Sequence, residues 1–320
     1  MPHNGIEMEK KDVRIVYMGT PEFAVAPLKA LVENGYNVVA VITMPDKPSG
    51  RGHKVQFSPV KEYALSVSLP VLQPERLKDE QFVEQLRSYN ADLQIVVAFR
   101  MLPEVVWAMP HLGTFNLHAS LLPQYRGAAP INRAIMNGEK ETGVTTFFLK
   151  HDIDTGDMIM QEKLSIGEDE DAGSLYDRLM CLGTETVLKT MEQILSGKVV
   201  RVPQPIIPEE ELKPAPKIFR ETCEIDFNQP ARQVHNFVRG LSPYPTAWCK
   251  LTISGEEKAV KIYAVRPMVE EHHLPCGRLL IEDKKRMRIA VKDGYVEVLE
   301  LQLPDKKRMT AQALLNGLHQ

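Results

Sequence analysis

Continuous apolar runs alternate with amphipathic segments along the first half of the chain. Runs typical of buried strands lie at VRIVYMGT (13–20), NVVAVIT (37–43), LQIVVAF (93–99), TFNLH (114–118) and GVTTFFL (143–149). Between the first two, PEFAVAPLKALVENG (21–35) is typical of a helix that ends at a glycine. Strands that are apolar on both faces indicate a parallel sheet with helices on both sides. The pattern predicts an α/β fold with a doubly wound, mostly parallel, Rossmann-like sheet, in which ligands bind beyond the carboxyl ends of the strands.

The pattern changes in the second half of the chain. A long helical segment (171–197) is followed by VPQPIIPEEELKPAPK (202–217), whose proline and glutamate content is typical of a linker. After one more helix (231–240), short apolar runs recur about every ten residues: AWCKLTI, AVKIYAV, GRLLI, RMRIAV and YVEVLEL. Closely spaced short strands predict a small OB-like β-barrel, and such barrels often bind nucleic acids. We therefore predict a catalytic domain over residues 1–206, and a linker with a C-terminal OB-like domain over 207–320.

Length and charge fit two domains. The 320 residues, of which 43% are hydrophobic, suffice for more than one core. The net charge of −3 hides an asymmetry, because acidic side chains outnumber basic ones up to residue 214 and basic ones outnumber acidic ones after it. The basic C-terminal part weakly favours a polyanionic partner for that half.

Composition also excludes several classes of protein. The first turn, GTPEF (19–23), has one glycine instead of GxGxxG, so a nicotinamide cofactor is not expected. The four cysteines are widely spaced without a CxxC pair, which indicates neither a disulfide framework nor a zinc knuckle. Because no run of 18 apolar residues and no signal peptide occur, we expect a cytoplasmic protein that avoids membranes, and we favour a monomer.

Three polar residues form a candidate catalytic set. Asn116 and His118 lie two apart near the end of a predicted strand, so both side chains point to the same face. Asp154 follows in the glycine-containing turn of KHDIDTGDMIM, between two apolar strands. Together an amide, an imidazole and a carboxylate can stabilise an oxyanion and transfer a proton. The alternative is that the histidine only satisfies a local hydrogen bond and that the aspartate lies in a solvated turn.

Metal sites are poorly supported by the same residues. The acidic turn lacks the EF-hand spacing, since Thr155 and flanking strands replace the required ligand and helices. His111, His118 and His151 lack the HExxH spacing of zinc enzymes. We therefore expect chemistry that requires no metal.

The segments FNLHASLLPQYRGAAPI (115–131) and DIDTGDM (152–158) resemble those of the folate-dependent formyltransferases. Further similar segments, among them GTPEFA, SPVK, LSPYPTAW and MTAQALLNG, extend the resemblance from about Val13 to Leu318. The resemblance implies that Asn116, His118 and Asp154 are the catalytic residues and that 10-formyltetrahydrofolate is the formyl donor. It also implies that the loop Ser120, Leu121, Leu122 and Pro123 lines the folate site.

One segment departs from the family pattern. Where the family usually has A-Y-G-x-I-L-P, this chain has A-F-R-M-L-P, which is one residue shorter. By resemblance, Phe99, Arg100, Met101 and Leu102 form a wall of the folate pocket. The departure is expected to alter the contacts with the pterin and to leave the reaction unchanged.

The narrower similarities concern the acceptor. The loop MPDKPSGRGHKV (44–55) carries Lys47, Arg51 and Lys54, which composition alone indicates as a solvated surface loop. By resemblance this loop contacts the acceptor stem of a tRNA, and the acceptor is the amino group of initiator methionyl-tRNA. Two basic clusters in the C-terminal part are candidates for backbone contacts, with solvated turns as the equal alternative: Lys284, Lys285 and Arg286, and Lys306, Lys307 and Arg308.

Three other functions are alternatives to formyl transfer to tRNA. A hydrolase could transfer the formyl group to water, and a glycinamide ribonucleotide enzyme could use a smaller acceptor. Neither would need the loop or the C-terminal domain. An RNA-binding protein without catalysis would leave Asn116, His118 and Asp154 without a purpose.

Overall fold

The computed structural model describes residues 6–49, 52 and 54–318. These residues form two compact units. The N-terminal unit extends to Arg126 and includes Gly143–Leu164 and Arg178–Lys213; the C-terminal unit comprises Gly127–Thr142, Ser165–Asp177 and the chain from Pro214 onward. Within the described residues, no helix has the length and apolar character that crossing a membrane requires.

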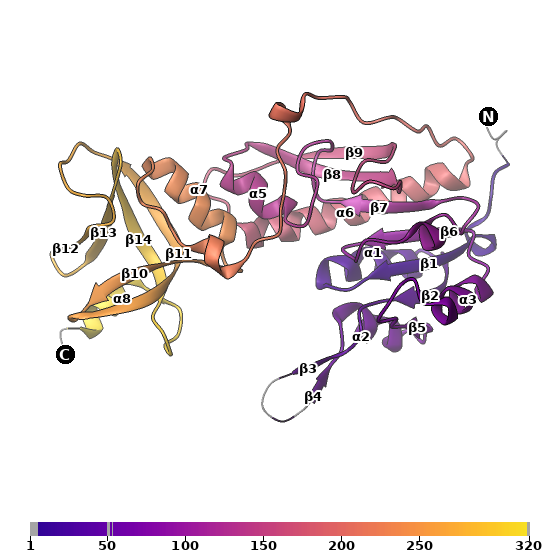
Figure 1. Cartoon of the computed structure of the whole chain (residues 1–320), viewed down its shortest axis with the longest axis horizontal. Helices are drawn as coiled ribbons and strands as arrows, with labels where there is room; N and C mark the ends of the chain where they lie inside the picture. The colour runs from indigo at the N-terminus through magenta and orange to yellow at the C-terminus, as the bar shows by residue number, and fades with distance from the viewer. Residues whose placement is uncertain (1–5, 50–51, 53, 319–320) are drawn as a thin grey trace. The chain divides into compact units, whose positions relative to one another are not determined.

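The first sheet has seven strands, five of which correspond to the predicted apolar runs, whereas β5 and β9 lie outside these runs (Figure 1). In spatial order they are β5 (Val71–Leu72), β2 (Asn37–Ile42), β1 (Arg14–Gly19), β6 (Leu93–Val97), β7 (Thr114–His118), β8 (Glu141–Phe148) and β9 (Met158–Ser165). The five strands from β5 to β7 pair in parallel, and β8 runs antiparallel to β7. The predicted mostly parallel, Rossmann-like sheet is therefore confirmed.

Helices and a short hairpin connect these strands. They are α1 (Glu22–Glu33), the hairpin strands β3 (Lys47–Ser49) and β4 (Lys54–Gln56), α2 (Pro59–Ser66), α3 (Glu80–Ser88), α4 (Glu104–Trp107), α5 (Pro130–Met136) and α6 (Ala172–Leu195). On one face of the sheet, Val16 and Met18 of β1 share a core cluster with Phe82 of α3. The residue between them, Tyr17, is fully buried on the other face. Burial on both faces explains why the strands are continuously apolar.

Gly19 allows the chain to turn closely from β1 into α1. A Cβ atom at this position would lie 2.6 Å from the Cβ of Ala24 and 2.8 Å from the carbonyl oxygen of Val97. The single glycine of GTPEF therefore serves helix and strand packing, which differs from the multiple glycines of a dinucleotide fingerprint.

The C-terminal unit contains a curled antiparallel sheet. Its strands are β10 (Ala247–Ile253), β11 (Glu256–Val269), β14 (Gly294–Gln302), β13 (Arg286–Val291) and β12 (Leu279–Glu282), with β15 (Met309–Thr310) added to β14. Helices α7 (Ala231–Leu241) and α8 (Ala311–Gly317) pack on this sheet through Val234, Val238 and Leu315. The predicted small OB-like barrel is confirmed as a half-barrel, because no pairing joins β10 to β12 among the described strands.

The predicted linker is extended and hydrogen bonded at several points. It contains the short turns η2 (Glu209–Glu211) and η3 (Arg220–Cys223). In the N-terminal unit, the Tyr125 amide donates to the Lys213 carbonyl over 2.7 Å. In the C-terminal unit, the Ala129 amide donates to the Ala215 carbonyl over 3.0 Å. A domain boundary at residue 206 stays a prediction.

Candidate active site

Asn116 and His118 occupy the carboxyl end of β7, in the interior of the sheet. His118 is 8% exposed, and Asn116 is partly buried. Phe115 and Leu117, which alternate with them, are buried at 0% and 3% exposure. The alternation places the amide and the imidazole on one face of the strand, as predicted. Among the described residues, no side-chain hydrogen bond engages the Asn116 amide, which leaves it available to a ligand.

The two nitrogen atoms of the His118 ring have different surroundings. Its Nε2 lies 2.8 Å from the carbonyl oxygen of Tyr125, and its Nδ1 lies 3.8 Å from Oδ2 of Asp154. Because a carbonyl can only accept, Nε2 carries the hydrogen and donates it to Tyr125. The Nδ1 atom is therefore the one that faces the carboxylate and that can exchange a proton.

Asp154 is held in an uncommon backbone conformation. Its φ of 54° lies in the left-handed region, which aspartate tolerates better than most residues. Its carbonyl accepts hydrogen bonds from Arg126 Nε at 3.2 Å and Gln204 Nε2 at 2.7 Å. Two residues later, a Cβ on Gly156 would lie 1.5 Å from the carbonyl oxygen of Phe148, so only glycine fits there. The DTGD segment is therefore a tightly fixed loop, where the sequence alone left a solvated turn open.

The loop that follows β7 is anchored to the neighbouring strands. The Ser120 hydroxyl is fully buried and donates to the Gln124 carbonyl over 2.7 Å. Thr145 donates to the Ser120 carbonyl over 2.7 Å, and Gln161 donates to the Leu122 carbonyl over 3.1 Å. Leu121 is partly buried, and Leu122 is 3% exposed. This segment is rigid, and the buried Ser120 hydroxyl is committed to its own loop.

Pro123 belongs to a pocket of about 280 Å³ beside the Asp154 loop. Its polar lining includes Arg126, Lys150, Thr155, Asp157 and Gln204. The remaining lining is apolar and comes mainly from the start of the linker, through Pro203, Pro205, Ile206, Ile207 and Leu212.

The shortened segment 99–102 is divided between the surface and the core. The Arg100 guanidinium donates to the carbonyls of Glu75 at 2.9 Å and Pro74 at 2.8 Å, and lies 5.1 Å from the Phe99 ring. Met101 is 66% exposed, whereas Leu102 is 7% exposed and part of the core. The arginine that replaces the usual family residue thus binds backbone carbonyls of a neighbouring loop.

The predicted acceptor-binding loop forms the hairpin of β3 and β4, which projects from the N-terminal unit (Figure 1). Lys47 and Lys54 are exposed on its two strands, and Arg51 lies outside the described residues. At the base, Lys61 lies 2.8 Å from Asp46 and its hydrogen bond lowers the pKa of that carboxyl. The sequence did not predict the strands, because exposed charges and prolines conceal them.

The basic clusters of the C-terminal unit separate into paired and unpaired cations. Arg286 donates to both carboxylate oxygens of Glu297 at 3.2 Å, and Arg308 pairs with Glu300. The lysines are exposed in turns and make no ion pair within the described part of the chain: Lys284, Lys285, Lys306 and Lys307. The arginines are therefore structural, and the four lysines remain candidates for a polyanion.

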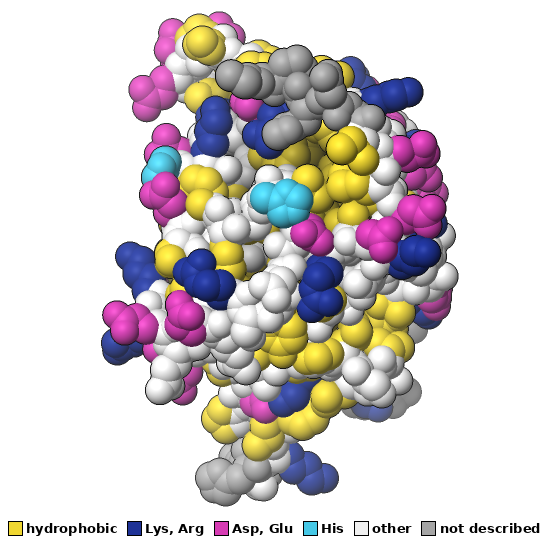
Figure 2. Space-filling view, turned by 90° about the vertical axis from the view of Figure 1, so that its right-hand side faces the viewer, with side chains coloured by type: hydrophobic (Ala, Val, Ile, Leu, Met, Phe, Trp, Pro, Cys, Tyr) yellow, Lys and Arg dark blue, Asp and Glu magenta, His cyan; other side chains and the backbone are white. Residues whose placement is uncertain are grey.

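On the face of the molecule in Figure 2, basic and acidic side chains are interspersed with apolar ones. Mixed charge of this kind does not indicate a polyanion-binding surface on that face.

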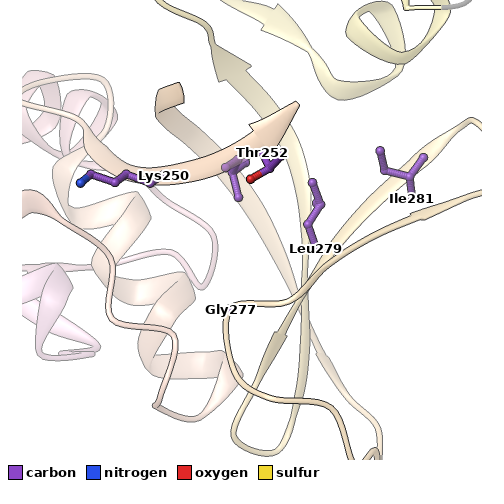
Figure 3. Close-up of a pocket in the computed structure, with 6 residues that line it drawn as sticks. Lys250, Thr252, Gly277, Leu279 and Ile281 are labelled. Atoms are coloured by element: carbon purple, nitrogen blue, oxygen red, sulfur yellow. The ribbon is translucent and has the colours of Figure 1, made fainter. Parts of the chain in front are cut away.

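A second pocket, of about 450 Å³, lies in the C-terminal unit beside the unpaired edges of β10 and β12 (Figure 3). Its described lining consists of Lys250, Leu251, Thr252, Gly277, Leu279 and Ile281. Its described lining contains none of the predicted site residues.

The sequence of this chain is similar to those of known proteins. The model of the formyl transferase family matches residues 13–191, and that of the formyl transferase C-terminal domain matches residues 217–319. Methionyl-tRNA formyltransferase of Bacteroides fragilis is 60% identical over 314 residues, which are 98% of this chain and 97% of that protein. The chain belongs to the methionyl-tRNA formyltransferase family. The methionyl-tRNA formyltransferase of Flavobacterium johnsoniae is 54% identical over 311 residues, which are 97% of this chain and 97% of that protein.

Solved structures support the fold at much lower identity. HypX from Aquifex aeolicus in complex with tetrahydrofolic acid has a TM-score of 0.63 and 22% identity, covering 96% of this chain and 48% of that one. An N-formyltransferase from Helicobacter canadensis, in complex with folinic acid and dTDP-3-aminofucose, has a TM-score of 0.62 and 19% identity, covering 93% and 100%. The fold is thus shared with proteins that are only distantly similar in sequence.

Proposed function

We propose that this chain transfers the formyl group of 10-formyltetrahydrofolate to the α-amino group of initiator methionyl-tRNA. The observation that carries the proposal is the 60% identity, over 98% of the chain, to a methionyl-tRNA formyltransferase. The arrangement of Asn116, His118 and Asp154 provides the chemistry that such a transfer needs.

An amine acceptor makes an enzyme nucleophile unnecessary. The neutral amine attacks the formyl carbon and forms the new carbon–nitrogen bond. The bond from that carbon to the folate nitrogen then breaks, and this nitrogen takes up one proton to leave as tetrahydrofolate, which balances the proton that the amine loses. Negative charge develops on the formyl oxygen during this exchange. The Asn116 amide, which has no side-chain partner in the described part of the chain, is placed to donate a hydrogen bond to that oxygen.

His118 and Asp154 manage the proton that the amine loses. The Tyr125 carbonyl occupies Nε2 of the ring, so the exchangeable position is Nδ1, 3.8 Å from Oδ2 of Asp154. A protonated ring can donate from Nδ1 to the reacting oxygen while the carboxylate accepts the amine proton. Both side chains are mostly buried, with 9% of His118 and 12% of Asp154 exposed.

The folate site is assigned to the rigid loop of Ser120, Leu121, Leu122 and Pro123 together with the wall of Phe99, Arg100, Met101 and Leu102. The fit rests on two observations: the first segment directly follows the catalytic strand, and Met101 is exposed next to a strand carboxyl end. With Arg100 bound to backbone carbonyls, main-chain groups and apolar side chains are left to recognise the pterin.

Binding of tRNA is assigned to two separate sets of cations. Lys47 and Lys54 lie on the two strands of the β3–β4 hairpin, which suits contact with the acceptor stem, and Arg51 is assigned to the same set from the sequence. The four unpaired lysines of the C-terminal turns suit contact with backbone phosphates. In this proposal residues 1–206 form the catalytic domain, and residues 207–320 form the linker and tRNA-binding domain.

The function is tested by supplying 10-formyltetrahydrofolate with a labelled formyl group and measuring its transfer to initiator tRNA charged with methionine. We expect labelled formylmethionyl-tRNA, and no more than slow label release when tRNA is omitted. Uncharged initiator tRNA and glycinamide ribonucleotide are the controls. Rapid release to water without tRNA would identify a hydrolase, and transfer to glycinamide ribonucleotide alone would identify a different acceptor.

A further inference from the structure

The beginning of the linker is docked on the edge of the Asp154 loop. The Met158 amide donates to the Val202 carbonyl over 2.7 Å, and the Val202 amide donates back to the Met158 carbonyl over 2.9 Å. This reciprocal pair fixes the chain two residues before Gln204. The glutamine therefore reaches the loop from a segment that is paired with β9.

The Gln204 side chain forms hydrogen bonds with the Asp154 loop through its amide nitrogen. Its amide oxygen binds Arg126, which itself contacts that loop. Its Nε2 donates to the Asp154 carbonyl at 2.7 Å and to the Gly156 carbonyl at 2.9 Å. Its Oε1 accepts from the Arg126 guanidinium at 2.7 Å, and Arg126 in turn donates to the Asp154 carbonyl at 3.2 Å. Both carbonyls that flank Thr155 are thus held by one side chain.

These hydrogen bonds matter because the backbone of Asp154 adopts an energetically unfavourable conformation. A non-glycine residue with φ of 54° is strained, and the conformation persists only when its surroundings enforce it. The carboxylate that faces Nδ1 of His118 extends from this backbone. Because a displacement of about 1 Å in a catalytic group can reduce the rate about 100-fold, the backbone needs a firm hold.

We propose that Gln204 is a positioning residue, which holds the Asp154 backbone so that the carboxylate faces His118. The proposal rests on the proposed function, in which Asp154 accepts the amine proton. The hydrogen bonds that the described structure gives the Gln204 side chain go to main-chain carbonyls and to Arg126. The glutamine acts through the main chain of the DTGD loop.

Two variants test the assignment in the full-length protein. Gln204→Met keeps the length of the side chain and removes all three hydrogen bonds. Gln204→Glu keeps the acceptor for Arg126 and removes both donors to the loop. For each, we expect kcat for formyl transfer to fall by about 10- to 100-fold, while KM for the formyl donor and for methionyl-tRNA stays within about threefold.

A double-variant cycle separates positioning from general stability. In an Asp154→Ala background, Gln204→Met should change the residual rate by less than about twofold, because the group it positions is gone. Gln229→Met is the matched control, since this glutamine of the C-terminal unit also donates to a backbone carbonyl, that of Asp226 at 3.0 Å. Its kcat should equal that of the wild type. Rates are normalised to the folded fraction from thermal unfolding, and Gln204→Glu decides the matter if Gln204→Met does not fold.

Unchanged kcat in the Gln204 variants would overturn the assignment, as would equal losses in the wild-type and Asp154→Ala backgrounds. Wild-type transfer to methionyl-tRNA is measured in the same experiment. Its absence would overturn the proposed function and this assignment together, whereas normal wild-type transfer with active Gln204 variants would overturn this assignment alone.

Discussion

At the scale of single residues, the sequence revealed the catalytic side chains better than the groups that hold them. The two-residue spacing of Asn116 and His118 on a strand dictates a common face, so their placement followed from geometry. The Tyr125 carbonyl and the Gln204 side chain could not be predicted in the same way. A carbonyl leaves no trace in the sequence, and Gln204 lies 50 residues from Asp154 in a segment typical of a linker.

Gly156 gives the sharpest test at this scale. In Gly156→Ala the new methyl group would overlap the Phe148 carbonyl, 1.5 Å away, so the loop must shift. We expect roughly 1–3 kcal/mol of destabilisation, and a fall in formyl transfer of about 100-fold. Urea unfolding and steady-state kinetics measure the two effects. Gly317→Ala, where the added atom meets no described atom within 4 Å, is the control, and equal behaviour of the two variants would refute the packing argument.

At the scale of elements, a strong apolar pattern predicted strands and a helix correctly, whereas exposed charged residues concealed two short strands. The strands β1, β2, β6, β7 and β8 and the helix α6 followed from the apolar pattern, because burial on one or both faces selects such residues. The strands β3 and β4 were missed because their described residues are exposed and carry no apolar alternation. The pairing of β11 with β14 joins segments that are distant in the sequence, which a single sequence does not encode locally.

Helix α7 carries a buried histidine whose ionisation affects stability. Burial, followed by the charges of nearby Arg232 and Arg239, lowers the pKa of His235 to about 4, although Asp169 at 3.2 Å and Glu168 oppose the shift. Burial outweighs the ion pair, since the side chain is only 5% exposed.

The folded state therefore resists protonation of His235 between pH 6.5 and about 4, while the unfolded chain accepts the proton. Stability from the neutral histidine is complete above pH 6.5 and is lost as the pH falls toward 4. Between pH 7.5 and pH 5, wild type should lose up to about 2 kcal/mol more unfolding free energy than His235→Gln. Urea titrations at both pH values measure this difference, and parallel losses in the two proteins would contradict the prediction.

The β3–β4 hairpin yields a prediction about tRNA binding. In the double variant Lys47→Ala and Lys54→Ala, each lost phosphate contact should reduce the salt slope of the tRNA affinity by roughly 0.7–0.9. The KM for the formyl donor should not change. Filter binding over a range of salt concentrations measures the slope. Lys11→Ala with Lys29→Ala is the control, because these lysines pair with Glu9 and Glu33 on the surface; an equal effect in both pairs would remove the hairpin from the tRNA site.

At the scale of the whole molecule, the change from alternating strands and helices to short strands predicted two kinds of fold in one chain. The structure confirms both, and it adds that residues 127–142 and 165–177 belong to the compact C-terminal unit. A linear division of the chain could not predict this, because α5 packs on α7 through side chains such as Asn132, which donates to the Gly240 carbonyl at 2.8 Å.

The basic residues of the C-terminal unit should have different roles, depending on whether they form ion pairs with acidic side chains. Neutralising Lys284 and Lys285 should weaken binding of tRNA and reduce its salt dependence, because both are exposed and unpaired within the described chain. Arg286→Ala should instead lower the melting temperature, because Glu297, 8% exposed, loses two hydrogen bonds. Binding assays and thermal unfolding of both variants measure this. Normal binding by the lysine variant would exclude this turn from the tRNA site.

The central claim is that this molecule formylates methionyl-tRNA through Asn116, His118 and Asp154, and a single-turnover experiment tests it most directly. Enzyme in excess over charged initiator tRNA is mixed with 10-formyltetrahydrofolate, and the transfer rate is compared between wild type and the three alanine variants. We predict that each substitution lowers the rate by about 100- to 1,000-fold with unchanged tRNA binding, and that combined substitutions cost far less than the product of the single effects. Near wild-type transfer by a folded Asn116→Ala, His118→Ala or Asp154→Ala variant would contradict the account.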